Sequence, residues 1–312
     1  MLAKVLTQLP LGVKVFLFNG KGYVLTDSAV LECILEEENS MRVLFTSKNA
    51  FILCHSTVGN ASIVGSENGL RVYDDESMEL RHTLLEGFEG GNSNCINAVK
   101  YSKDGSRVVT GDLNGGVKVW DTENWKVLIT LEHKSSVRTL DYSPDGRQFV
   151  SAGDDKLLVI SDVETGEIKH TLQGHTGIIW TVVYSPDGRY LSSCGDKSVR
   201  VWDLKTGKCK HIFLHENMVW SVAYSPDGET IFSGDDKGII KTWDAETGEC
   251  KQTLGDEIGG IHHIGAVNSI SCIDPTNIVT GGVDGQIISW NLEEEKESPL
   301  WIDSSDEEEE YY

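Results

Sequence analysis

The sequence is poor in several features that mark particular classes of protein. No apolar run approaches the roughly 20 residues that a membrane-spanning helix needs. Basic residues are also scarce: 27 lysines and arginines stand against 49 acidic residues, which gives a net charge of -22. Such a charge repels the phosphate backbone of nucleic acids. We therefore expect neither membrane insertion nor direct nucleic-acid binding.

The cysteines do not form a pattern that would bind zinc or build a disulfide framework. There are 7, an odd number, and no two are spaced as C-x-x-C. Reduced thiols are typical of cytoplasmic or nuclear proteins, where we expect this chain. Its apolar start is interrupted by Thr7, Pro10 and Lys14, which argues against a signal peptide. No glycine-rich run is present to hold a nucleotide phosphate, so we expect no cofactor and no metal.

What the sequence does contain is a repeated phrase. Tyr-Ser-Pro-Asp-Gly begins at Tyr142, Tyr184 and Tyr224, and each copy predicts a strand, a tight turn and a second strand. A second phrase with a Thr-Gly turn follows each copy. One position near the end of the repeat recurs every 41 residues and then after 47: Trp120, Ser161, Trp202, Trp243 and Trp290. A period of this length is typical of a propeller blade with four strands.

These phrases resemble the WD40 family over roughly residues 40 to 292. Trp-Asp stands at residues 120–121, 202–203 and 243–244, and Gly174-His175 is the Gly-His pair of the family. Among WD40 proteins, the chain also resembles the Ski8-like propellers through its size and the run from His215 to Asp236. The resemblance implies an all-β fold.

The length of the repeat region predicts the number of blades. Residues 1–292 divide into seven repeats of a length within the family's range, so we expect a seven-bladed propeller. Four strands between Val13 and Thr46 would form the blade that lacks a signature. Lys4–Leu9 is similar to the outer strand Lys126–Leu131. We therefore expect the N-terminal strand to complete the last blade and close the ring.

The WD40 resemblance also implies a structural network, in which Asp orients His, His bonds Ser or Thr, and this hydroxyl accepts the indole N–H of Trp. Two complete sets are His175, Ser192, Asp196, Trp202, and His263, Thr280, Asp284, Trp290. Elsewhere Lys237 replaces the expected Asp, and Ser161 replaces the expected Trp. A His, Ser and Asp set would also suit a nucleophilic enzyme, but no G-x-S-x-G turn exposes the serine. We expect no enzyme activity.

Residues at the start of the innermost strands should project to the mouth of the central channel. They are Asn97, Arg138, Ile178, Trp180, Met218, Trp220 and Asn268. Family members often bind partners at these positions, and Trp and Arg are enriched at binding hot spots. We therefore predict a partner-binding patch on this face. The alternative is that both indoles fold inward and plug the channel.

The end of the chain, residues 293–312, contains 10 acidic residues and a single lysine, and we expect a flexible acidic tail. Ser304 and Ser305 are each followed three residues later by Glu, which makes them candidate phosphorylation sites.

The function that best fits these features is that of a non-catalytic scaffold or adaptor. We expect a monomeric propeller within a hetero-complex, with other proteins or peptides as partners. Two alternatives stay open. The first is binding of histones or other basic proteins through the acidic tail, and the second is an enzyme with its site in the central channel.

Overall fold

The structure is a computed structural model. It describes residues 2–8, 14–18, 21–25, 29–33, 41–46, 50–56, 61–66, 69–74, 79–84, 95–255 and 261–293. Side chains are described at residues 61, 63, 70–74, 79–84, 95–255 and 261–293. Within this part of the chain, no helix has the length and apolar character needed to cross a membrane.

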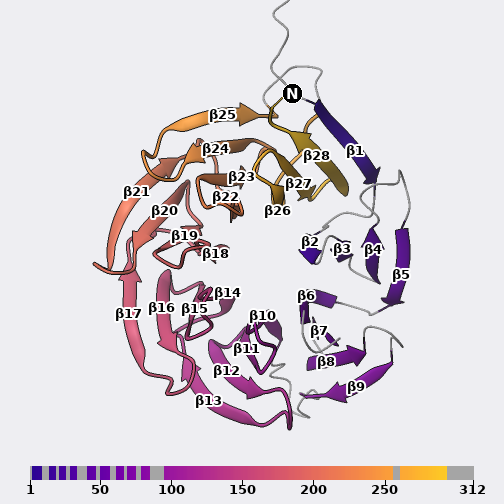
Figure 1. Ribbon diagram of the computed structural model, residues 1–312, viewed down its shortest axis with the longest axis vertical. Helices are drawn as coiled ribbons and strands as arrows, with labels where there is room; N and C mark the ends of the chain where they lie inside the picture. Colours follow the sequence, from indigo (N-terminus) through magenta and orange to yellow (C-terminus); the bar gives the residue numbers. More distant parts are fainter. Residues whose placement is uncertain are drawn as a thin grey trace, which may run out of the picture.

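The strands pair antiparallel into four-stranded sheets that follow one another along the chain (Figure 1). Sheet 1 contains β2 (Lys14–Phe18), β3 (Lys21–Leu25), β4 (Ala29–Cys33) and β5 (Met41–Thr46). Sheet 2 contains β6 (Ala50–Ser56), β7 (Ala61–Ser66), β8 (Gly69–Asp74) and β9 (Leu80–Thr83). Sheet 3 contains β10 (Ile96–Tyr101), β11 (Arg107–Asp112), β12 (Gly116–Asp121) and β13 (Val127–Glu132). The strands expected between Val13 and Thr46 are those of sheet 1.

The later sheets repeat the same order of strands. Sheet 4 contains β14 (Val137–Tyr142), β15 (Gln148–Gly153), β16 (Leu157–Asp162) and β17 (Ile168–Gln173). Sheet 5 contains β18 (Thr181–Tyr184), β19 (Tyr190–Cys194), β20 (Ser198–Asp203) and β21 (Lys208–Leu214). Sheet 6 contains β22 (Val219–Tyr224), β23 (Thr230–Asp235), β24 (Ile240–Asp244) and β25 (Cys250–Leu254). Sheet 7 contains β26 (Val267–Asp274), β27 (Asn277–Gly282), β28 (Gln286–Asn291) and β1 (Leu2–Gln8).

The sheets lie around a common centre, with the first strand of each sheet innermost (Figure 1). Innermost strands of successive sheets contact one another from β6 through β10, β14, β18 and β22 to β26, and β26 contacts β2. β1 pairs antiparallel with β28, so that Leu2 lies opposite Asn291 and Gln8 opposite Gln286. The all-β class is confirmed, and the repeated four-stranded sheets are those of a propeller blade.

Sheets 4, 5 and 6 begin with the hairpin that the repeated phrase predicts. In sheet 4, the Ser143 hydroxyl donates to Asp145 (2.6 Å), and Asp145 accepts the backbone N–H of Arg147 (3.1 Å). Gly146 has a φ of 72°, a conformation that glycine adopts without steric cost. Because the strands alternate in direction, these turns lie on one face of the molecule, which we call the bottom face. The turns between second and third strands lie on the opposite, top face.

The hydrophobic core lies between neighbouring sheets. Most of the clusters contain the tryptophan of the later sheet, as with Trp202 between sheets 4 and 5 and Trp290 between sheets 6 and 7. The cluster between sheets 3 and 4 lacks one, because Ser161 stands at that position. The core therefore forms as a series of junctions, and the composition of each junction is set by its own two sheets.

Candidate functional site

Two tryptophans from neighbouring sheets meet at the top face. Trp180 immediately precedes β18, and Trp220 lies in β22. Their rings stack with centroids 4.4 Å apart and planes inclined by 20°. Both side chains are half-buried, and neither indole N–H has a hydrogen-bond partner among the described residues. The sequence prediction placed these residues on adjacent blades, and the structure brings their rings into contact.

Arg138 extends this cluster toward sheet 4. Its guanidinium donates two hydrogen bonds to Asp154, from Nε (2.7 Å) and from an Nη (3.0 Å). This pairing raises the pKa of Arg138 and holds the guanidinium 5.4 Å from the centroid of the Trp180 ring. Met218, two residues before Trp220, is 41% exposed, and Ile178, two residues before Trp180, is half-buried. We call Arg138, Ile178, Trp180, Met218 and Trp220 the top-face cluster.

The other two residues predicted for this face lie on β10 and β26. Asn97 is half-buried and its amide donates to the hydroxyl of Ser136 (2.9 Å), which links sheet 3 to the start of sheet 4. Asn268 is also half-buried. Among the hydrogen bonds and ring contacts of the described residues, none joins Asn97 or Asn268 to the indole pair.

A buried hydrogen-bond network ties sheet 7 together. The indole N–H of Trp290 donates to the Thr280 hydroxyl (2.8 Å), and this hydroxyl bonds Nε2 of His263 (2.7 Å). Nδ1 of His263 then lies 3.1 Å from a carboxylate oxygen of Asp284. All four residues predicted for this set are therefore brought together, and each buried polar group has a partner.

The corresponding set in sheet 5 requires a correction, because the hydroxyl belongs to Ser193 and not to Ser192. The Ser193 hydroxyl accepts the indole N–H of Trp202 (2.9 Å) and bonds Nε2 of His175 (2.8 Å). Asp196 lies 3.3 Å from Nδ1 of His175. The Ser192 hydroxyl instead donates to Tyr224 of the next sheet (2.7 Å).

The physical reason for this shift is a shorter turn. Between the paired residues Cys194 and Val199 the chain has one residue fewer than between Gly234 and Ile240 in sheet 6. Counting back from Trp202 by the spacing of the other sheets therefore overshoots by one position.

Sheet 6 supplies a carboxylate that the sequence reasoning missed. Lys237 stands at the position expected for Asp, but Asp235 lies 3.5 Å from Nδ1 of His215. The backbone N–H groups of Lys237 (2.9 Å) and Ile239 (3.0 Å) donate to Asp235. The pKa of Asp235 is lowered because the hydrogen bonds outweigh the opposing effect of burial. The sequence signal for Asp235 was its position two residues after Ser233, the serine of this network.

The electrostatics of these networks favour neutral histidine and ionised aspartate. Burial lowers the pKa of His175 and His263 below 6.5, although the adjacent carboxylates act in the opposite direction. Burial alone would raise the pKa of Asp196, but hydrogen bonds from Ser198 and Thr176 lower it to about 2. A histidine held between a carboxylate and a hydroxyl in this way keeps one tautomer.

The same geometry is unsuited to nucleophilic catalysis. Ser193 is 0% exposed, and its oxygen already accepts the indole N–H of Trp202. A substrate therefore has no access to the hydroxyl, and the arrangement is that of a structural network. Within the described ranges, no group of three or more His, Cys, Asp and Glu side chains could hold a metal ion. Ser304 and Ser305 lie outside the described residues, as does all of the chain after residue 293.

Comparisons with known proteins agree with this architecture. The family described as "WD domain, G-beta repeat" matches residues 166–203 and 207–244. The family described as "Eukaryotic translation initiation factor eIF2A" matches residues 77–161. Repeated four-stranded sheets, Trp-Asp signatures and the His, Ser or Thr, and Trp networks together define a propeller-type repeat protein. The segment 166–244 therefore consists of WD40 repeats.

Several named proteins are similar to it in part. Autophagy-related protein 16 of Arabidopsis thaliana is 28% identical over 64% of this chain and 38% of its own length. Protein tipD of Dictyostelium discoideum is 28% identical over 66% of this chain and 33% of its own length. Serine-threonine kinase receptor-associated protein of Rattus norvegicus is 32% identical over 37% of this chain and 33% of its own length. The chain thus spans about a third of the length of these relatives, and the family supports a role in protein interaction.

Proposed function

We propose that this protein is a non-catalytic scaffold or adaptor subunit that binds protein partners through the top-face cluster. The observation that carries the proposal is the stacked pair of Trp180 and Trp220, which lies at the top face with both side chains half-buried. A half-buried indole pair offers a large rigid contact surface, and tryptophan and arginine are the residues most enriched at binding hot spots.

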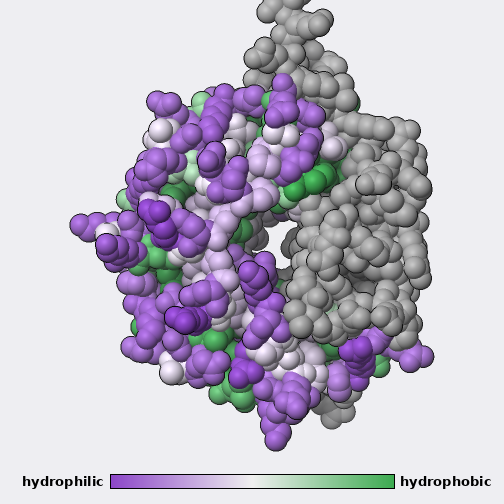
Figure 2. All heavy atoms as spheres, in the orientation of Figure 1, coloured by the Kyte–Doolittle hydropathy of each residue, from purple (hydrophilic) through white to green (hydrophobic). Residues whose placement is uncertain are grey.

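The surroundings of the pair support a compact site. Figure 2 shows hydrophilic residues over most of the coloured surface, with hydrophobic residues in small separate groups. Arg138, fixed by Asp154 beside the Trp180 ring, adds a cation, and Met218 adds an adaptable apolar contact. A partner segment would gain most of its affinity from a few central residues rather than from a broad apolar face.

The test is affinity capture from the source cell with the full chain and with a Trp180→Ala, Trp220→Ala double variant. We expect each truncation to weaken partner binding by about 2 kcal/mol or more. The matched control replaces Val127 and Leu128, which are 41% and 48% exposed on an outer strand, with alanine. Partners lost only from the tryptophan variant support the proposal. Equal recovery with both variants contradicts it.

The relatives' names are consistent with service in protein complexes, and one is named as a subunit: the chromatin assembly factor 1 subunit FAS2 homolog of Oryza sativa subsp. japonica, 29% identical over 36% of this chain. We propose a monomeric propeller within a hetero-complex, located in the cytoplasm or nucleus. The similarity to Ski8-like propellers stays a prediction.

Binding of basic proteins through residues 293–312 is the main alternative to binding through the top-face cluster. A chain that ends at Leu292 separates these two functions. The shortened chain should keep the partners that the top-face cluster binds.

We further propose that residues 1–292 form a closed seven-bladed ring and that the remaining residues form a separate tail. The pairing of β1 with β28 supports closure by the N-terminal strand, because an unpaired β28 would be an open sheet edge. Deleting residues 1–10 should therefore lower the melting temperature markedly. An unchanged melting curve would contradict closure.

A further inference from the structure

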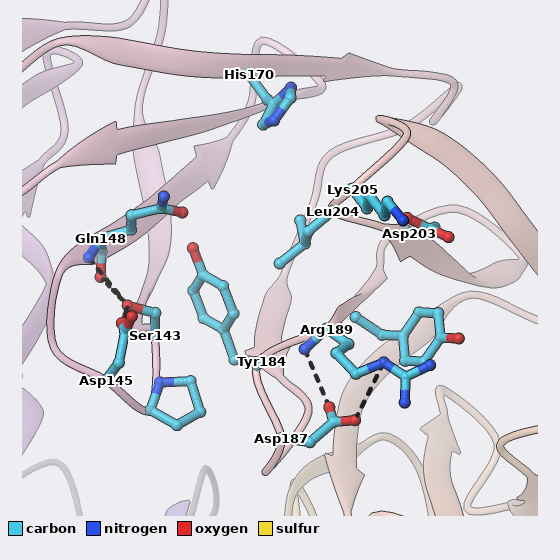
Figure 3. Close-up of a pocket in the computed structure, with 13 residues that line it drawn as sticks. Ser143, Asp145, Gln148, His170, Tyr184, Asp187, Arg189, Asp203, Leu204 and Lys205 are labelled. Carbon is cyan, nitrogen blue, oxygen red and sulfur yellow. Dashed lines mark hydrogen bonds and ion pairs between the residues drawn. The ribbon is translucent and has the colours of Figure 1, made fainter.

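A cavity of about 680 Å³ lies on the bottom face between sheets 4 and 5. Its wall includes Gln148 and His170 from sheet 4 and Tyr184 and Leu204 from sheet 5 (Figure 3). The equivalent cavities are smaller, about 270 Å³ between sheets 3 and 4 and about 330 Å³ between sheets 5 and 6. The repeat thus leaves a groove at each of these junctions, and one groove is about twice as large as the others.

The Tyr184 hydroxyl is an unpartnered group inside this cavity. The residue is 6% exposed, and its hydroxyl has no hydrogen-bond partner among the described residues. Figure 3 shows the hydroxyl pointing into the space bordered by Gln148, His170 and Leu204. The equivalent Tyr224 is bonded by Ser192 (2.7 Å), whereas sheet 4 has Val150 in place of that serine. A ligand in the cavity could supply the missing partner.

The junction between sheets 5 and 6 shows how such a groove is filled from within the chain. Nζ of Lys210 donates to the carboxylate of Glu246 (2.8 Å) and lies 4.7 Å from the centroid of the Tyr190 ring. His211 Nε2 also lies 3.0 Å from the backbone carbonyl of Glu246. A cation of the chain itself therefore contacts two residues that line this groove, Tyr190 and Glu246.

The larger groove lacks these contacts. Lys169 corresponds to Lys210. Its Nζ pairs with the carboxylate of Glu167, two residues earlier in the chain (2.6 Å). Lys205 stands where sheet 6 has Glu246, and Gln148 stands where sheet 5 has the bulkier Tyr190. The groove between sheets 4 and 5 is thus open because Lys169 pairs within sheet 4, whereas Lys210 bridges sheets 5 and 6.

The charges of the two walls differ. On sheet 4, hydrogen bonds from Ser143 and the backbone of Arg147 lower the pKa of Asp145, which keeps this carboxylate ionised. On sheet 5, Arg189 lies 3.7 Å from Asp187, and Lys205 stands beside Asp203, which also lines the cavity. The sheet 4 side therefore favours a cation, whereas the sheet 5 side carries two cations and two carboxylates.

We propose that this cavity binds a short peptide segment of a protein partner, with an arginine side chain against sheet 4. A guanidinium has five N–H donors, which suits the acceptors Tyr184 Oη, Gln148 Oε1 and the Asp145 carboxylate. Its aliphatic stem can pack against Leu204. The cavity volume is within the range of ligand sites.

The test measures binding of fluorescein-labelled peptides to the full chain by polarisation. The probe contains one arginine flanked by glycines, and the matched peptide carries citrulline in place of arginine. This neutral replacement should weaken binding by about tenfold, because hydrogen bonds to charged groups are the stronger ones. No binding of the probe, or equal binding of the citrulline peptide, overturns the proposal.

Variants locate the binding. Tyr184→Phe should weaken the probe about tenfold without lowering the melting temperature, because the hydroxyl removed has no protein partner. The matched control Tyr224→Phe removes a bonded hydroxyl, so it should lower stability and leave probe binding unchanged. Gln148→Tyr should block the groove. Unchanged binding in Tyr184→Phe and Gln148→Tyr overturns the proposal, whereas the Trp180→Ala, Trp220→Ala variant should bind the probe as the wild type does.

Discussion

Sheets 7 and 4 contain the same chain of carboxylate, histidine and hydroxyl but differ at its last member. In sheet 7, the hydroxyl that bonds His263 (2.7 Å) also accepts the indole N–H of Trp290. In sheet 4, His133 bonds Ser151 at the same 2.7 Å, although Ser161 replaces the tryptophan. The histidine and hydroxyl therefore reach their positions without an indole.

The difference lies in the core between sheets. Trp290 is buried in the cluster that joins sheets 6 and 7, whereas Ser161 is 0% exposed and its hydroxyl has no partner among the described residues. We infer that the tryptophan mainly joins neighbouring sheets, while the histidine ties strands within one sheet.

The largest expected effect comes from giving sheet 7 the composition of sheet 4. Trp290→Ser removes a buried indole from the core and should cost about 3–5 kcal/mol of unfolding free energy. Urea unfolding followed by circular dichroism measures this loss. A cost below about 1 kcal/mol, the size of an average substitution, would show that the indole does not join the sheets.

A smaller effect separates the two adjacent serines of sheet 5. Ser193→Ala removes the hydroxyl shared by His175 and Trp202, which should cost about 1–3 kcal/mol because both partners stay buried. Ser192→Ala removes one hydrogen bond to Tyr224 and should cost about 0.5–1.5 kcal/mol. Melting temperatures of the two variants give the order. A larger loss for Ser192→Ala would contradict the register.

The place of Ser193 shows where prediction from the sequence succeeded and failed. The hairpins and the network of sheet 7 were predictable, because Trp290 and Thr280 keep the spacing found in most repeats. In sheet 5, counting back from Trp202 to the network serine crosses a turn that is one residue shorter, and the count therefore ends at Ser192. Counting forward from the turn that begins at Ser185 gives Ser193, because no residue is lost in that interval.

The sequence could not reveal the features that depend on two sheets at once. The adjacency of Trp180 and Trp220 followed from the repeat, but their stacking depends on how the two sheets are inclined. The bottom-face cavity arises because Val150, Gln148 and Lys205 differ from their equivalents at the next junction. Val150 leaves the Tyr184 hydroxyl without the hydrogen bond that Ser192 gives to Tyr224, and the other two differences leave the groove beside this hydroxyl open.

A pH titration should extend the comparison to the histidines of sheets 5 and 7. Burial lowers the pKa of His175 and His263 below the usual 6.5, so the unfolded chain binds more protons near pH 6. Their contribution is complete above pH 6.5 and is lost as the pH falls toward the lower folded pKa. Unfolding free energy should therefore fall between pH 8 and pH 5.5, and less steeply in His263→Asn. Equal slopes for the variant and the wild type would contradict this assignment.

The smallest effect is expected at Ser161, and its sign is informative. Its hydroxyl is buried without a partner, so Ser161→Ala removes a polar group that gains nothing in the folded state. Removing such a group should leave the unfolding free energy unchanged or raise it by up to about 1 kcal/mol, in contrast to the loss expected for Ser193→Ala. Urea unfolding of the variant beside the wild type measures the difference. A loss of more than about 1 kcal/mol would mean that the hydroxyl has a hydrogen-bond partner in the folded protein, and that sheet 4 compensates for its missing tryptophan through a polar contact.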